Sequence, residues 1–160
     1  PLRYMDRYVT VKQGEVFYIT EALATLEGME KGPAGNTSLA AAFSLAQEMD
    51  QDQIIVAQET EYTGAGKHIQ PQLAFARQNG IEMVFGDPRE EIAGKNIVFP
   101  AHPGLLKAQD ADLDRMRTSL IRRQASRATG PITDADIAYL VEETNSTPEF
   151  VKSVLTSLGY

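Results

Sequence analysis

Short apolar runs alternate with helix-like segments over the first hundred residues, and this alternation constrains the possible fold most strongly. Four runs rich in β-branched or aromatic side chains predict strands at residues 8–11, 53–58, 81–85 and 96–100. Three segments with helical spacing or helix end signals lie at residues 15–26, 38–50 and 71–80. Strands that alternate with helices predict an α/β fold, in which helices cover a parallel or mixed sheet.

Local end signals define the limits of these helices. Gly28 is a typical residue at which the first helix would end, and Asn36 or Thr37 is suited to cap the second. Pro71 and Gly80 bracket the third helix in the order that helices prefer. The Gly- and Pro-rich stretch between the first two helices predicts a loop.

The chain changes character at residue 110. Acidic side chains stand at the start of residues 110–127 and five arginines follow them, an order that complements a helix dipole. Thr133 and Asp136 have the spacing of a capping box, and Thr147 before Pro148 predicts a further helix start. We therefore predict a partial α/β domain at residues 1–109 and a helical tail at residues 110–160.

Composition excludes several classes of protein. The 160 residues have a net charge of -7, which argues against general attraction to nucleic acid or an anionic membrane. There are no cysteines, so disulfides and thiolate chemistry are excluded. No apolar run approaches the ~20 residues of a membrane span, and we see no signal peptide, so we expect a cytoplasmic protein. The start at Pro1 leads us to expect a trimmed chain or a fragment.

The stretch "IIVAQETEYTGAGKH", residues 54–68, is the first candidate site. A phosphate-binding loop would need glycine where Glu61 stands and serine or threonine where His68 stands, so that interpretation fails. Ligands of open α/β sheets nevertheless bind beyond the carboxyl ends of strands, and this loop follows such a run. A solvated glycine turn is the alternative.

The stretch "GPAGNTSLAAAF", residues 32–43, is the second candidate. Its small residues would let the backbone approach a ligand closely, and free amides at a helix start suit an anion. A plain capped helix with a tight entry loop explains the same spacing.

Two further patterns point to ordinary structural roles. His68 and His102 have no carboxylate at a metal-ligand interval, so we expect no metal site. The arginines between residues 115 and 127 precede a helix pair that resembles a DNA-binding motif. Residues 133–160 hold five acids and one lysine, a net charge of -4, which argues against DNA binding. We expect the arginines to face acidic neighbours or a subunit interface.

Several segments resemble a known enzyme family. "LEGM", "GPAGNTSLAAAFSLAQEM" and "QIIVAQETEYTGAGK" are similar to fold-type II pyridoxal-phosphate enzymes, which include threonine synthase, tryptophan synthase beta and the serine and threonine dehydratases. "ETEYTGAGKH", "PQLAFARQNGIE" and "GDPREEIAGKNIVFPAHP" more specifically resemble the beta subunits of 2-amino-4-oxopentanoate (2-amino-4-ketopentanoate) thiolases. The resemblance covers residues 8–109 and implies a three-layer, twisted, mostly parallel sheet flanked by helices.

The resemblance also implies a reaction. Pyridoxal 5'-phosphate would serve as electron sink while coenzyme A cleaves the amino-acid substrate to acetyl-coenzyme A and alanine, a step of ornithine catabolism. An alpha subunit would be the partner. Another fold-type II lyase or synthase, of the threonine synthase or ammonia-lyase type, is one alternative. A non-catalytic α/β binding module is the other.

The family pattern assigns cofactor-binding roles to four residues. Thr63 fits best as the hydroxyl that faces the pyridine nitrogen, and Thr60 is second. Glu59 in that place would favour a protonated ring, and Gly64 completes the cofactor-binding set.

Lys67 and His68 are the expected substrate-binding residues. The lysine that forms the Schiff base with the cofactor is expected outside these 160 residues, as is the main phosphate-binding loop. We therefore expect an N-terminal half to be supplied from elsewhere, and the chain alone to be inactive.

Overall fold

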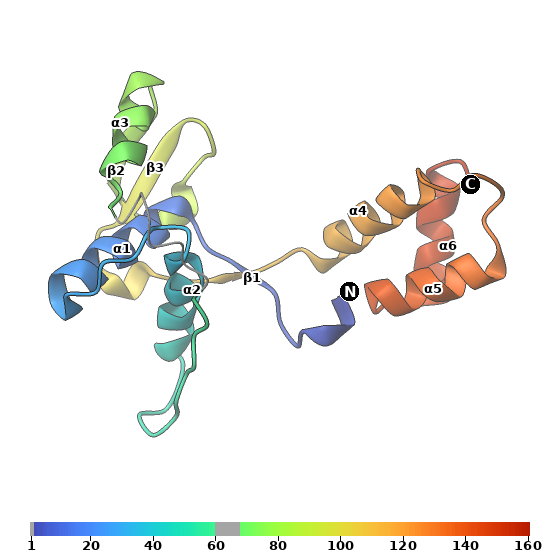
Figure 1. Cartoon of the computed structure of the whole chain (residues 1–160), viewed down its shortest axis with the longest axis horizontal. Coiled ribbons are helices and arrows are strands. Elements are labelled where there is room, and N and C mark those ends of the chain that lie inside the picture. Colours follow the sequence, from blue (N-terminus) through green and yellow to red (C-terminus); the bar gives the residue numbers. More distant parts are fainter. Residues whose placement is uncertain (1, 60–67) are drawn as a thin grey trace. The chain divides into compact units, whose positions relative to one another are not determined.

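The computed structural model describes residues 2–59 and 68–160, and it divides the chain into two units. The larger unit is Val9–Gln109, and the helical unit combines residues 2–8 with Asp110–Tyr160. The described residues form a mixed α/β structure with six α-helices and two two-stranded sheets (Figure 1). These residues do not by themselves form a three-layer sheet, which stays a prediction.

The larger unit contains most of the predicted helices and strands. Its elements in chain order are β1 (Val9–Thr10), α1 (Gln13–Glu27), α2 (Asn36–Ala46), α3 (Gln70–Gln78), β2 (Glu82–Gly86), β3 (Asn96–Pro100) and the start of β4 (Gln109–Asp110). The predictions of α1, α3, β1, β2 and β3 are confirmed to within a few residues. Gly28 ends α1 in the left-handed conformation, with φ of 66°.

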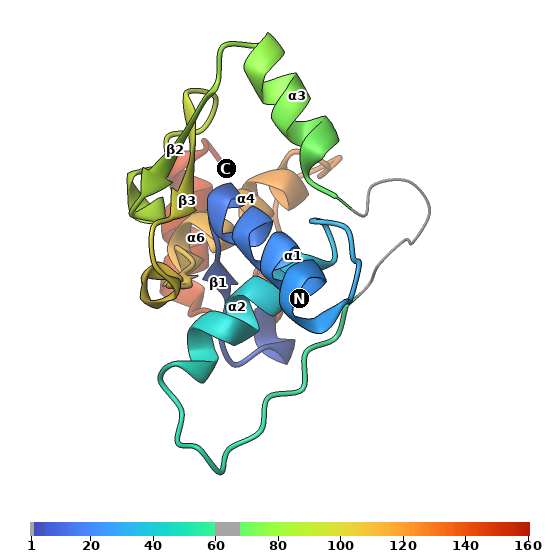
Figure 2. The same ribbon diagram turned by 90° about the vertical axis from the view of Figure 1, so that its left-hand side faces the viewer.

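α1 is the central helix of the larger unit. It contacts β3 on one side and α2 on another, as Figures 1 and 2 show. Phe17 of α1 is buried with Ile97 of β3 and Leu73 of α3 in one apolar cluster. Val16, Ile19 and Ala40 form a second cluster, which joins α1 to α2. Burial of these apolar side chains stabilises the unit.

The predicted cap of α2 is wrong. Gly35 is the capping residue, and Asn36 is the first residue of the helix. Asn36 is fully buried, and its Nδ2 donates a hydrogen bond to Thr20 Oγ1 of α1 at 3.0 Å. Its side chain therefore joins two helices instead of capping one.

The strand predicted at residues 53–58 is also absent from the structure. These residues have no regular secondary structure, and Ile54 and Val56 are 86% and 91% exposed. A strand is stabilised by hydrogen bonds to a neighbouring strand, and none of the described strands pairs with this segment. The apolar pattern alone therefore did not determine the conformation.

β2 and β3 form a parallel pair in which Glu82 is aligned with Asn96 and Gly86 with Pro100. Gly80, with φ of 69°, forms the turn that leads from α3 into β2. Phe85 packs on Phe99 with their ring centroids 5.5 Å apart, yet Phe85 is 78% exposed.

The helical unit comprises a short 3-10 helix, η1 (Leu2–Tyr4), with α4 (Leu113–Ala125), α5 (Asp134–Thr144) and α6 (Pro148–Ser157). The capping box of Thr133 and Asp136 is confirmed, as is Thr147 at the start of α6. Ile121 and Val151 are fully buried at the centre of the unit. No described helix is both long enough and apolar enough to cross a bilayer.

Candidate functional site

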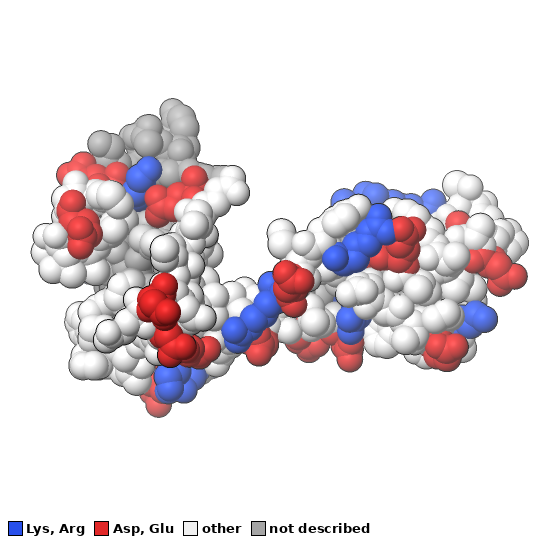
Figure 3. Space-filling model, turned by 90° about the horizontal axis from the view of Figure 1, so that it is seen from below, with Lys and Arg blue, Asp and Glu red and all other residues white. Residues whose placement is uncertain are grey.

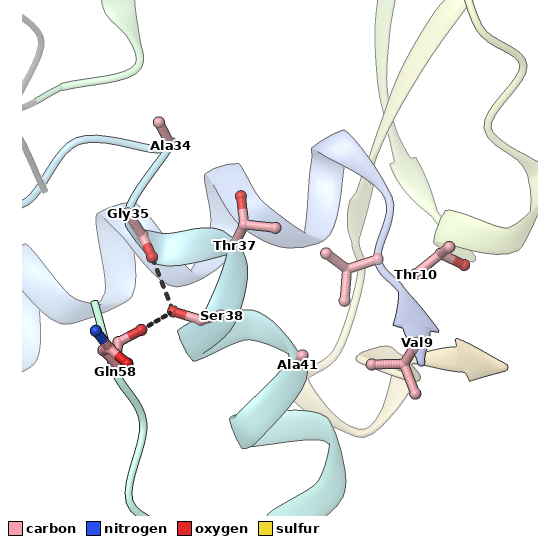
Figure 4. A pocket seen from close by; sticks show the side chains of 9 residues that line it. Val9, Thr10, Ala34, Gly35, Thr37, Ser38, Ala41 and Gln58 are labelled. Carbon is pink, nitrogen blue, oxygen red and sulfur yellow. Dashed lines mark hydrogen bonds between the residues drawn. The ribbon is translucent and has the colours of Figure 1, made fainter. Parts of the chain in front are cut away.

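The two glycine-rich candidate segments meet in the larger unit. Ser38, in the first turn of α2, lies with its Oγ 2.9 Å from the carbonyl oxygen of Gln58 and 3.1 Å from that of Gly35 (Figure 4). A hydroxyl has one proton, so it donates to one of these carbonyls at a time. This contact fixes the end of residues 53–58 beside the loop that enters α2.

Of the four predicted cofactor-binding residues, Glu59 is the one that the structure describes. Its Oε2 lies 3.8 Å from Nζ of Lys31, and its side chain is 17% exposed. Its Oε1 is buried and accepts no hydrogen bond from any residue in the described ranges. Because a buried carboxylate oxygen without a donor is costly, this position favours a donor or cation.

A cavity of about 530 Å³ lies next to these residues. Its volume falls in the range of about 300–1,000 Å³ that is usual for small-molecule sites. Small side chains leave the space open, and hydroxyls supply polar contacts. The lining residues are Val9, Thr10, Val11, Ala34, Gly35, Thr37, Ser38, Ala41 and Gln58 (Figure 4).

Most of the predicted site residues lie outside the described ranges. Thr60, Thr63, Gly64 and Lys67 belong to residues 60–67, so their cofactor and substrate roles stay predictions. His68 is described and exposed, two residues before the start of α3.

His102 has a local structural contact. Its Nδ1 accepts a hydrogen bond from the backbone N–H of Gly104 at 3.0 Å and so caps the 3-10 helix η3 (Pro103–Leu105). Among the residues that the structure describes, no three metal-ligating side chains come together.

Sequence reasoning missed Lys31, Ser38 and Gln58 as parts of this site. Ser38 and Gln58 are 20 positions apart, and their contact depends on how the chain returns to the start of α2. The turn "GPAGNTS" indicated that the backbone could be approached closely there. It did not indicate that Gln58 is the residue that lies against it.

In the larger unit, two carboxylates with shifted pKa values, Glu15 and Asp87, are not among the candidate site residues. Burial raises the pKa of Glu15, although its carboxylate accepts hydrogen bonds from the amides of Lys12 and Lys107 at 2.6 and 2.8 Å. Hydrogen bonds from the side chain and backbone of Arg89 lower the pKa of the half-buried Asp87 to about 2. Both carboxylates have structural partners.

The larger unit is thus an α/β structure in which a cavity of the size of a small-molecule site lies at the start of α2. The chain is 66% identical over 159 residues to a 2-amino-4-ketopentanoate thiolase beta subunit of Acetoanaerobium sticklandii. It is 57% identical over 160 residues to a protein of the same name from an unknown prokaryotic organism. Each match covers 99% of this chain.

The match spans only a third of each relative, 34% of its length. No protein-family model matches the chain, and no solved structure matches it. The similarity to the two thiolase beta subunits is therefore the finding that bears on function.

Proposed function

We propose that this chain forms part of the beta subunit of a pyridoxal-phosphate-dependent thiolase. The enzyme would cleave 2-amino-4-ketopentanoate with coenzyme A to acetyl-coenzyme A and alanine, in ornithine degradation. The identity of 66% over 99% of the chain to a subunit of that name carries the proposal. Identity at this level over 99% of the chain argues against an unrelated binding module.

The described residues fit one wall of a cofactor site. The cavity provides space beside α2, and Glu59 Oε1 is a buried acceptor without a donor among the described residues. Glu59, Thr60, Thr63 and Gly64 would hold the cofactor, with a threonine hydroxyl toward the pyridine nitrogen. Pyridoxal phosphate, when bound, would supply the electron sink for the carbanion equivalent left at the substrate's β-carbon when the bond to the keto carbon breaks.

Two contacts would position this wall. Ser38 holds the backbone at Gln58, and Lys31 draws the second oxygen of Glu59 toward the loop before α2. Together they would fix where residues 60–67 begin. Lys67 and His68 would then bind the substrate at the far end of the same loop.

The remaining parts of the site would come from outside this chain. Among the 160 residues no lysine has the family context of the Schiff-base lysine. We propose that the lysine and the phosphate-binding loop lie in the part of the subunit that the match does not cover, and that an alpha subunit completes the enzyme.

The direct test is the reaction itself. The full-length beta subunit would be co-expressed with its alpha subunit and given 2-amino-4-ketopentanoate and coenzyme A, and the products would be identified by mass spectrometry. We expect acetyl-coenzyme A and alanine in equal amounts. Release of ammonia without acetyl-coenzyme A would favour the lyase alternative, and a folded complex without either activity would refute the proposal.

A further inference from the structure

A groove in the helical unit lies outside the proposed cofactor site. It has a volume of about 440 Å³ and is formed by α4 and the start of the chain. Leu2, Met116 and Leu120 provide apolar side chains, and Arg115, Ser119 and Arg123 provide polar ones. On α4 these residues form two adjacent stripes with four-residue spacing, so the groove follows the helix axis.

The two arginines of the groove have no side-chain partner among the described residues. Arg115 and Arg123 are exposed, and neither side chain has an ion pair or hydrogen bond with any residue in the described ranges. Arg117 differs, because it bonds to Asp114 and to the carbonyl oxygens of Thr144 and Asn145.

Two acids near the start of α4 have partners within the helical unit. Asp112 accepts a hydrogen bond from the backbone N–H of Arg115 at 2.9 Å, and Asp114 pairs with Arg117. Figure 3 shows basic side chains gathered along one edge of the helical unit. In a chain of net charge -7, this groove is thus a local basic surface with an apolar floor.

We propose that an acidic amphipathic helix of the companion subunit docks in this groove. The inference rests on the proposed function, because the relatives are named beta subunits and a beta subunit implies a partner chain. Arg115 and Arg123 are eight residues apart, about 12 Å along the helix axis. A complementary helix would place two acids about two turns apart, with apolar residues between them against Met116 and Leu120.

The test measures binding of the purified alpha subunit to the full-length beta subunit and to two double variants of it. Arg115→Glu with Arg123→Glu reverses the charges of the groove. Arg122→Glu with Arg127→Glu makes the same charge change at exposed arginines that do not line it. We expect the groove variant to weaken binding by at least about tenfold and the control by less than about twofold. The difference should shrink at high salt.

Other outcomes overturn the inference. Equal loss in both double variants would indicate general charge attraction, and absence of binding by the unmodified full-length subunit would remove the partner. Self-association that only the groove variant abolishes, measured by light scattering, would make a second copy the occupant. Circular dichroism checks that both variants fold. If the groove variant binds the alpha subunit as well as the control does and the enzyme keeps its thiolase activity, this inference is refuted and the proposed function stands.

Discussion

At the scale of single residues, Gly14 lies in close contact with the sheet. A Cβ atom at this position would overlap the carbonyl group of Val98 in β3. The absence of a side chain thus allows the first turn of α1 to lie directly on the sheet.

Gly14→Ala should therefore destabilise the larger unit. We expect a loss of at least about 2 kcal/mol in the free energy of unfolding, because either the helix or β3 must move. Gly130→Ala is the matched control, since no atom lies within 4 Å of a Cβ at that position. Urea denaturation measures both, and equal midpoints for the two variants would contradict the close approach.

Glu15 gives a prediction about pH. Burial raises the pKa of Glu15 above the ordinary value of 4.5. At a pH between the unfolded and the folded pKa, the folded state therefore holds a proton that the unfolded state has released. Its contribution to stability is therefore full below pH 4.5 and is lost as the pH rises through the raised folded pKa.

Glu15→Gln removes this titration. We expect the stability of the unmodified chain, measured relative to that of the variant, to fall as the pH rises above 4.5 and through the raised pKa of Glu15. Urea denaturation at a series of pH values gives this difference directly. A difference that stays constant or grows with pH would contradict the assignment.

At the scale of elements, Glu91 joins α1 to the sheet. Its carboxylate accepts hydrogen bonds from the amides of Gln13 and Gly14 at the start of α1, at 3.0 and 2.9 Å. It also accepts one from Val98 of β3 at 3.1 Å. The first amides of a helix lack partners within the helix, and a negative charge there is favourable.

Glu91→Ala should leave these three amides without their acceptor and cost about 2 kcal/mol of stability. Glu90→Ala is the control, because Glu90 is an exposed neighbour and its side chain has no described partner. Amide hydrogen exchange should show faster opening at the start of α1 in the Glu91 variant alone. Equal protection in the two variants would show that the carboxylate does not hold the helix.

The elements that sequence predicts well are those defined by local contacts. Thr133 with Asp136, Thr147 with Pro148, and Gly28 all act within one helical turn, so their spacing is sufficient. The failures at residues 53–58 and at Asn36 have a common cause. Whether those residues form a strand, or cap a helix, depends on partners distant in sequence, as with Thr20 for Asn36.

At the scale of the whole molecule, the candidate site was only partly predictable. Sequence patterns identified both glycine-rich segments, and the structure brings their described ends together through Ser38 and Gln58. Lys31 and Ser38 were not predicted, because their roles arise only when distant segments meet. The chain matches 34% of the length of its relatives, and we propose that the rest of the site lies in the part that the match does not cover.

We propose that the segment beginning at Glu59 forms one wall of a pyridoxal-phosphate site. The most direct measurement is the affinity of the full-length beta subunit for pyridoxal phosphate, followed by absorbance, for Glu59→Gln and for Glu48→Gln at an exposed site. We predict about tenfold weaker binding for Glu59→Gln and unchanged binding for Glu48→Gln. Equal affinities, or a full-length subunit that binds no pyridoxal phosphate, would contradict the account.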